Sequence, residues 1–154
     1  MANKPLTSEE FKTIYSKVPR FCLELIVRTS EGIVLTLRRL PTWNNQWHIP
    51  GATLFYGERV DDAVQRIAHD ELGISVIVDE LLGYNEYPSE QKERGFGWSV
   101  GLIFLCHPAD QDQQMRPNDE ASMIRAFREI PENIIKEHAI FLRSKGLLND
   151  NLTK

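Results

Sequence analysis

The sequence predicts an α/β fold, in which helices on both faces of a mixed β-sheet form an α/β/α sandwich. Helical and strand-like patterns follow one another in the order helix, strands, helix, strands, helix. The 154 residues are 42% hydrophobic, which suits one domain with its own buried core. No repeat, low-complexity tract or linker interrupts the chain. We therefore expect a single domain over residues 1–154, with a helical extension over residues 1–20.

The chain should open with a helix and a hairpin. Thr7 and Glu10 have the spacing of a capping box, and apolar residues at helical intervals follow, so a helix should end before Pro19. Residues 21–29 and 33–37 are rich in β-forming residues and are separated by a Ser-Glu-Gly turn. This arrangement predicts two antiparallel strands joined by a tight turn.

The remaining elements follow from the same patterns. Apolar runs bounded by Gly and Pro predict strands, and apolar residues three or four apart predict helices. The expected elements are a loop over 40–46, a short strand over 47–50, a helix from about Asp61 to Leu72 stopped by Gly73, a strand over 74–82, a polar, mobile segment over 88–94, a strand over 98–107, a loop over 109–118, a short strand over 121–127, a helix from Pro131 to about Lys145, and a frayed tail over 149–154.

Composition excludes several classes of protein. The formal net charge is -4 and the basic residues are scattered, which argues against a nucleic-acid partner. No apolar run approaches the length of about 20 residues that spans a bilayer, and the first residues lack a signal peptide's apolar stretch, so we expect a cytoplasmic protein with no membrane partner. Cys22 and Cys106 lie in apolar runs and are expected to be buried small hydrophobes.

The stretch around residues 50–74 is the most informative part of the sequence. Asp70 and Glu71 end the expected helix, where carboxylates oppose the helix macrodipole. Mg²⁺ binds a few hard oxygen ligands, and the carbonyl of Gly51 in a Pro-Gly turn is a candidate. The stretch therefore predicts a Mg²⁺ site, with Mn²⁺ as the alternative ion. The simpler interpretation is that both carboxylates face solvent.

This stretch resembles the Nudix box. Glu58, Arg66 and Gly73 match the box residues that organise the loop and helix, and Glu71 matches its final Glu. Three positions depart from it, because Ala52 replaces the opening Gly, Ile67 the first helical Glu and Asp70 the second. The resemblance implies the Nudix fold and hydrolysis of a nucleoside diphosphate linked to another group. Ile67 can neither bind metal nor accept a proton, so a two-metal mechanism does not carry over.

Within the Nudix family the chain is most similar to the GDP-mannose mannosyl hydrolases, which also lack the first helical Glu. This resemblance implies one Mg²⁺ held by the Gly51 carbonyl and Glu71, and a nucleotide sugar as substrate. It also implies that Arg39 neutralises the departing diphosphate, with Arg38 beside it, and that Glu24 lies near the substrate. Arg39 as a surface cation and Glu24 pointing outward from a strand are the alternatives.

The general base is left open by the sequence. The late loop that supplies a metal-binding Gln and a catalytic His in that subgroup carries Glu120 and Ala121 here. Ala121 has no group that accepts a proton, so Glu120 is the best candidate for base or metal ligand. His48 and His69 are weaker choices.

Two functions fit these sequence features. The first is a Mg²⁺-dependent hydrolase, with attack on carbon or on phosphorus undecided. The second is a Nudix-derived binding module for a nucleotide or phosphorylated metabolite, which the losses at Ile67 and Ala121 favour. A homodimer formed through the opening helix is a further expectation, which comes from the family resemblance alone.

Overall fold

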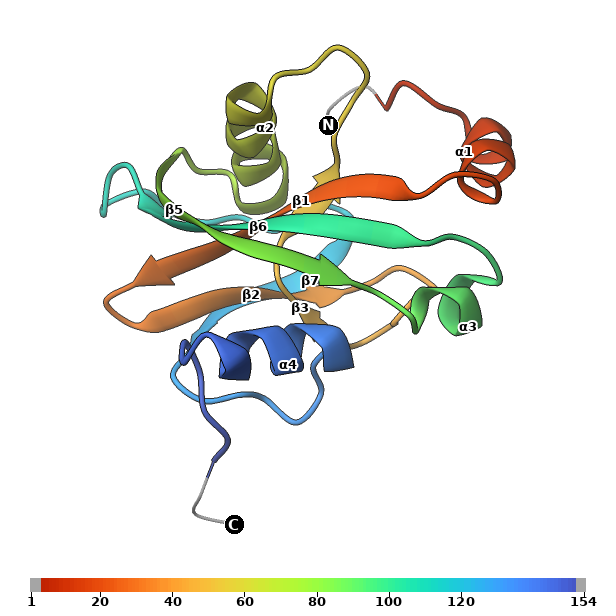
Figure 1. Ribbon diagram of the computed structural model, residues 1–154. Coiled ribbons are helices and arrows are strands. Elements are labelled where there is room, and N and C mark those ends of the chain that lie inside the picture. Colours follow the sequence, from red (N-terminus) through yellow and green to blue (C-terminus); the bar gives the residue numbers. More distant parts are fainter. Residues whose placement is uncertain (1–3, 152–154) are drawn as a thin grey trace.

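The computed structural model describes residues 4–151, and helices and strands alternate along it in the expected order (Figure 1). The α/β fold is confirmed. The elements are α1 (Ser8–Tyr15), β1 (Arg20–Thr29), β2 (Gly32–Arg38), β3 (Trp47–His48), β4 (Gly51–Thr53), α2 (Val60–Leu72), β5 (Val76–Glu86), α3 (Glu90–Arg94), β6 (Ser99–Pro108), β7 (Ala121–Phe127) and α4 (Lys136–Ser144).

The strands form one mixed sheet around β1. The main path of the sheet runs β3-β2-β1-β6-β5, while β4 pairs with β1 and β7 pairs with β2. β1 is parallel to β6, and the other strand pairs are antiparallel. β1 has strand partners on both edges and contributes side chains to the cores on both faces of the sheet, and its residues from Cys22 to Val27 are all buried. Any side chain that β1 presents near the middle of the sheet is therefore held rigidly.

Two helices cover opposite faces of this sheet (Figure 1). α2 contributes Ile67 and Leu72 to a core that also contains Leu23 and Leu25 of β1. α4 contributes Leu142 to a second core on the other face. Full burial of each such side chain contributes about 1.5–3 kcal/mol, so the two cores fix both helices on the sheet.

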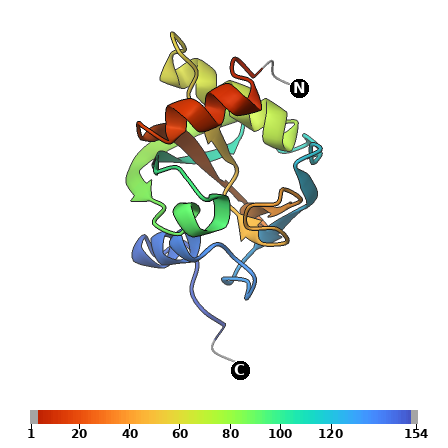
Figure 2. The ribbon, with the colours of Figure 1, turned by 90° about the vertical axis from the view of Figure 1, so that its right-hand side faces the viewer.

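α1 and α3 lie together at one end of the sheet (Figure 2). α1 begins with the expected capping box, in which the Glu10 N–H donates to Thr7 Oγ1 and Glu10 accepts from the Thr7 N–H. No residue of α1 is buried. The helix is held instead by Phe11, whose ring lies 5.3 Å from the guanidinium carbon of Arg20 and 5.4 Å from that of Arg94. α1 thus covers this end of the molecule through contacts with cationic side chains.

Two segments differ from the sequence-based expectation. Residues 88–94 were expected to be polar and mobile, but they contain α3, and Glu90 is only 1% exposed. Arg20 and Ser99 bind the Glu90 carboxylate, which fixes this polar segment through contacts distant in sequence. The last helix starts at Lys136 rather than at Pro131. The end of the expected tail, residues 152–154, lies outside the described residues.

Other expectations agree with the structure. Gly73 ends α2 in the left-handed conformation at φ 70°, as a glycine stop should. Cys22 and Cys106 are buried free thiols. Among the helices of residues 4–151, none is long and apolar enough to cross a membrane.

Candidate active site

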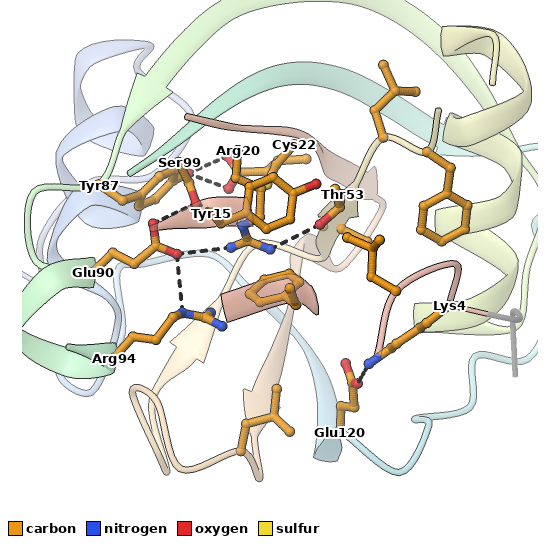
Figure 3. Close-up of a pocket in the computed structure, with 18 of the residues that line it drawn as sticks. Lys4, Tyr15, Arg20, Cys22, Thr53, Tyr87, Glu90, Arg94, Ser99 and Glu120 are labelled. Carbon is orange, nitrogen blue, oxygen red and sulfur yellow. Dashed lines mark hydrogen bonds and ion pairs between the residues drawn. The ribbon is translucent and has the colours of Figure 1, made fainter. Parts of the chain in front are cut away.

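A cavity of about 860 Å³ is lined in part by residues of α1 and α3 (Figure 3). The walls come from α1, β1, β4, the end of α2, the segment before β7 and α4, which are far apart in the sequence. Of the residues that the sequence singled out, the cavity is lined by Glu24, Arg38, His48, Gly51, Arg66, Asp70, Glu71 and Glu120. Arg39, Glu58, His69 and Gly73 are not part of its lining.

Carboxylates gather at one side of this cavity. Glu71 is 8% exposed, and burial together with the nearby charge of Glu120 raises the pKa of its carboxyl from 4.5 to about 7. The charge of Asp70 also raises the pKa of Glu71, whereas the charges of Arg38 and Lys4 lower it. Among the described residues, none donates a hydrogen bond to the Glu71 carboxylate. The site therefore has an excess of negative charge that a bound cation would relieve.

Gly51 lies beside these carboxylates on the short strand β4. It faces Glu24 on β1 in the antiparallel register, and the Leu25 N–H donates to the Pro50 carbonyl in the next pair. Hydrogen-bonded and non-hydrogen-bonded pairs alternate along such a ladder. The pair of Gly51 with Glu24 is thus non-hydrogen-bonded, so the Gly51 carbonyl points away from β1.

The Thr53 carbonyl shows which helix lies on the side of β4 opposite to β1. Thr53 is two residues from Gly51, and its carbonyl accepts a hydrogen bond from Arg66 Nη2 of α2 at 2.9 Å. Carbonyls two residues apart on a strand point the same way. Arg66 and Asp70 lie one turn apart on α2. The Gly51 carbonyl consequently faces the side on which α2 presents its carboxylates.

The Gly51 carbonyl and the nearby carboxylates suit a divalent cation that also binds water and substrate oxygens. Among residues 4–151, no group of three or more His, Cys, Asp or Glu side chains is arranged to hold a metal ion, so side chains alone do not complete a metal shell here. Mg²⁺ commonly binds through one or two carboxylates, with water and substrate phosphate oxygens completing the shell. Glu71 and the Gly51 carbonyl supply hard oxygen ligands of this kind, with Asp70 and Glu120 nearby.

The two adjacent arginines take different positions. The pairing of β2 with β7 shifts between Leu37 and Arg38, which turns Arg38 into the cavity. Arg38 Nε and Nη2 donate to the carbonyl and hydroxyl of Thr42 at 2.9 and 2.8 Å. Desolvation lowers the Arg38 pKa to about 10, so the group remains cationic at neutral pH. Arg39 is exposed, and its backbone N–H bonds the Glu120 carbonyl.

Glu120 faces the cavity together with the N-terminal segment. Lys4 Nζ lies 2.6 Å from Glu120 Oε1, and 68% of the Lys4 side chain is exposed (Figure 3). Such an exposed pair contributes about 0–1 kcal/mol, so it can open readily when a ligand enters. Ala121, which follows it, is 3% exposed at the start of β7 and offers no reactive group.

The Glu58 and Arg66 pair is present as expected. Arg66 Nε and Nη2 bind the two Glu58 oxygens at 2.6 and 2.9 Å, and the Phe55 ring stacks 3.8 Å from the Arg66 guanidinium. This pair ties the loop after β4 to α2.

The two candidate histidines lie in different surroundings. His69 is largely exposed, with Nδ1 3.7 Å from Asp70. His48 is buried, which lowers its pKa to about 3 and keeps it neutral.

Two groups of cavity residues were not found from the sequence. The first is Tyr87 and His138, which bond to each other and to Glu24. The second is Arg20 with Glu90, between β1 and α3 (Figure 3). Both groups join residues at least 50 positions apart, so no local motif announces them. A signal was present only at His138, a polar residue on the apolar side of the last helix.

Comparison with known proteins agrees with this architecture. Residues 20–144 match a family model described as the NUDIX domain. A MutT-like protein of Streptomyces ambofaciens is 30% identical over 117 residues, which are 76% of this chain and 70% of that protein. The low-salt glycan biosynthesis protein Agl8 of Haloferax volcanii is 34% identical over 89 residues, 56% of this chain, and the match spans 57% of that protein.

Solved structures share the fold at lower sequence identity. A MutT Nudix hydrolase from Burkholderia pseudomallei superposes with a TM-score of 0.71 at 21% identity, covering 82% of this chain and 98% of that chain. The family match spans all strands of the sheet, all of α2 and α4, and most of the cavity residues.

Proposed function

We propose that this chain, which belongs to the Nudix family, is a Mg²⁺-dependent hydrolase of a nucleoside diphosphate linked to a sugar. The observation that carries this proposal is that Glu71, Asp70 and Glu120 line one cavity with Arg38 and the Gly51 edge of β4. Carboxylates beside a guanidinium suit a cation and a diphosphate bound together, because each charge then has a partner of opposite sign.

Each group has a distinct part in the proposed reaction. Glu71 and the Gly51 carbonyl would hold the metal, with Asp70 beside them. When bound, Mg²⁺ supplies Lewis-acid stabilisation of the diphosphate charge. Arg38 faces the same space and would bind phosphate oxygens through its remaining N–H groups. Arg39 is kept as a second candidate for this role.

The chemical step needs a group that accepts a proton from water. Glu120 is the proposed base, because its carboxylate lines the cavity near Glu71 and its ion-pair partner among residues 4–151 is the exposed Lys4. Water would attack while its proton passes to Glu120, and the bond to the leaving diphosphate or phosphate would break. The leaving oxygen would depart as an anion, and the Arg38 guanidinium is placed to offset its charge.

A binding module is the second candidate. Ile67 is fully buried in the core between α2 and the sheet and cannot be recruited to the cavity, and Ala121 replaces the late-loop His that the resemblance would supply. Both positions lack reactive groups. On this alternative the chain would bind a nucleotide or phosphorylated metabolite in the same cavity without turnover.

Product analysis in ¹⁸O-labelled water separates these functions. With Mg²⁺, nucleotide sugars, other diphosphate conjugates and nucleoside triphosphates are each incubated with the protein, and the products are resolved by mass spectrometry. Labelled free sugar indicates attack on carbon, and labelled nucleoside diphosphate indicates attack on its terminal phosphorus. Nucleoside monophosphate indicates cleavage within the diphosphate.

Two controls complete that experiment. Glu71→Gln and Glu120→Gln are expected to reduce turnover at least 100-fold while the fold is retained, as judged by circular dichroism. Chelation with EDTA should abolish turnover in the unmodified protein. Tight nucleotide binding without any product across the panel would establish the binding module instead.

The proposal extends to assembly and location. α1 exposes Ile14, and Val18 and Phe21 are exposed close behind it, so this end offers apolar surface for a homodimer. We propose such a dimer in the cytoplasm, with no nucleic-acid or membrane partner. Light scattering coupled to size-exclusion chromatography tests the dimer, and Val18→Glu should shift it toward monomer.

A further inference from the structure

One arginine of the cavity, Arg94, lies on the wall that α3 forms. It is the last residue of that helix, its side chain is 20% exposed, and it lines the cavity. Figure 3 shows it across the drawn pocket from Glu120. A largely buried cation needs a partner for its charge and acceptors for its N–H groups. The contacts of Arg94 therefore bear on what the cavity binds.

The nearest carboxylate, Glu90, is shared between two arginines. Glu90 is 1% exposed, and its Oε1 accepts a hydrogen bond from Ser99 Oγ at 2.7 Å. Its Oε2 accepts from Arg20 Nη2 at 3.1 Å. Arg94 Nε lies 3.4 Å from the same Oε2, an ion-pair contact that does not have the geometry of a hydrogen bond. One carboxylate thus serves two guanidinium groups.

Arg20 and Arg94 differ in how fully their donors are used. Arg20 Nε donates to Ser99 Oγ and Nη1 to Thr53 Oγ1, both at 3.1 Å, so each of its three nitrogens has an acceptor. Within the part of the chain that the structure describes, no residue accepts a hydrogen bond from Arg94, and its Nε is buried. A guanidinium carries five N–H donors. Arg94 can therefore donate to a ligand in the cavity.

Two phenylalanines support the Arg94 charge without using these donors. The rings of Phe11 and Phe96 lie 5.4 and 5.8 Å from its guanidinium carbon. Gly95 ends α3 in the left-handed conformation at φ 83°, which turns the chain so that Phe96 lies beside Arg94. Cation–π attraction stabilises the charge, but a ring face provides no oxygen acceptor for the N–H groups in the guanidinium plane.

This wall of the cavity has an excess of positive charge. Desolvation and the charge of Arg20 lower the pKa of Arg94, and the charge of Glu90 opposes them only in part. A guanidinium nevertheless stays protonated in proteins. A neutral acceptor would satisfy its N–H groups but leave the charge excess, whereas an oxyanion would satisfy both.

We propose that Arg94 binds a second oxyanion of the substrate, a carboxylate or a phosphate that lies outside the diphosphate. The planar fork of a guanidinium matches the paired oxygens of either group. The diphosphate is assigned to the side of Glu71 and Arg38, and a cavity of about 860 Å³ has room for a further charged group. The inference rests on the proposed function for that assignment, and it narrows the substrate class to acidic nucleotide conjugates.

Two matched pairs of ligands test this site. UDP-glucuronate differs from UDP-glucose by a carboxylate on the linked sugar, and ADP-ribose 2′-phosphate differs from ADP-ribose by a phosphate on the ribose. Each ligand is titrated calorimetrically with Mg²⁺ into Glu120→Gln protein, in which turnover is expected to be slow. Arg94→Met and Arg94→Lys are then added to this protein. Arg28→Met is the matched control, because Arg28 is exposed and outside the cavity lining.

The acidic member of at least one pair is expected to bind at least tenfold more tightly than its neutral partner. Arg94→Met should weaken the acidic member about 10- to 100-fold, as for a lost hydrogen bond to a charged group, and leave the neutral member unchanged. Arg94→Lys keeps the charge without the fork and should lose less. A preference for UDP-glucuronate assigns a carboxylate on the linked group, and a preference for ADP-ribose 2′-phosphate assigns a phosphate on the ribose.

The inference is overturned if neither acidic ligand is preferred, or if both members of each pair weaken equally in the Arg94 variants, as a purely structural role would require. Arg28→Met should change no affinity. Failure of this inference is distinguishable from failure of the proposed function. Turnover of nucleotide sugars without an Arg94-dependent preference refutes the oxyanion site alone, whereas an Arg94-dependent preference without turnover by the unmodified protein refutes the hydrolase alone.

Discussion

The Arg66 guanidinium and the Glu58 carboxylate form a two-point ion pair, with both N···O distances below 3 Å. Arg66 also donates to the Thr53 carbonyl and stacks on Phe55. One side chain thereby connects β4, the loop that follows it and α2. Because Gly51 lies on β4 and Glu71 on α2, this pair sets the relative position of two groups that we assign to the metal site.

Loss of this ion pair should destabilise the protein in a pH-dependent way. Arg66 lowers the pKa of Glu58 below 4.5, so the stabilisation is present above that pH and is lost as pH falls through the folded-state value. Glu58→Gln should cost about 1.5–3 kcal/mol at pH 7, in the range for hydrogen bonds to charged groups. Urea unfolding at pH 7 and pH 3 measures this, and an equal cost at both pH values would contradict it.

Glu71 should have the opposite effect on stability. Its folded-state pKa of about 7 is higher than 4.5, so the folded state holds this proton more tightly and stability falls as pH rises from about 4.5 to 7. The difference corresponds to about 3 kcal/mol. Without metal, Glu71→Gln should therefore raise the melting temperature at pH 8 and leave it nearly unchanged at pH 4.

Metal binding supplies the control for Glu71. Mg²⁺ competes with the proton for this carboxylate, so added Mg²⁺ should raise the melting temperature of the unmodified protein more at pH 8 than at pH 6. Glu71→Gln should lose most of this response. A Mg²⁺ effect that survives in the variant would remove Glu71 from the metal site.

The two arginines after β2 should differ in their effect on turnover. Arg38 lines the cavity and Arg39 is exposed outside its lining, although the family resemblance favoured Arg39. Arg38→Ala is expected to lower kcat/KM about 10- to 100-fold, equivalent to about 1.4–3 kcal/mol. Arg39→Ala should lower it less than threefold. Steady-state kinetics on the substrate found by product analysis decides, and a larger effect at Arg39 would restore the resemblance-based assignment.

The two thiols should be inert in the folded protein. Burial raises the pKa of Cys22 to about 11 and that of Cys106 to about 12, so almost no thiolate exists at pH 8. Titration with a disulfide reagent should label neither thiol in the native state and both in 6 M guanidinium. Rapid labelling of Cys22, which lines the cavity, would show that this wall opens frequently.

The sequence predicted those parts of the protein that depend on local pattern. The capping box of Thr7 and Glu10, the hairpin of β1 and β2, and the glycine stop at Gly73 each follow from the chemistry of neighbouring residues. The spacing in residues 50–74 was sufficient to anticipate the contact of Glu58 with Arg66, because strand, loop and helix are adjacent in the chain.

Only the tertiary structure decided which side chains share the cavity. Tyr87 and His138 are 51 residues apart, and they meet Glu24 because α4 packs against the face of the sheet from which Glu24 projects. α3 forms in a polar segment because Arg20 binds Glu90 from a distant strand. Arg38 lines the cavity and Arg39 does not, and the pairing of β2 with β7 shifts register just before Arg38. Such contacts follow from packing between elements, which a local sequence pattern does not encode.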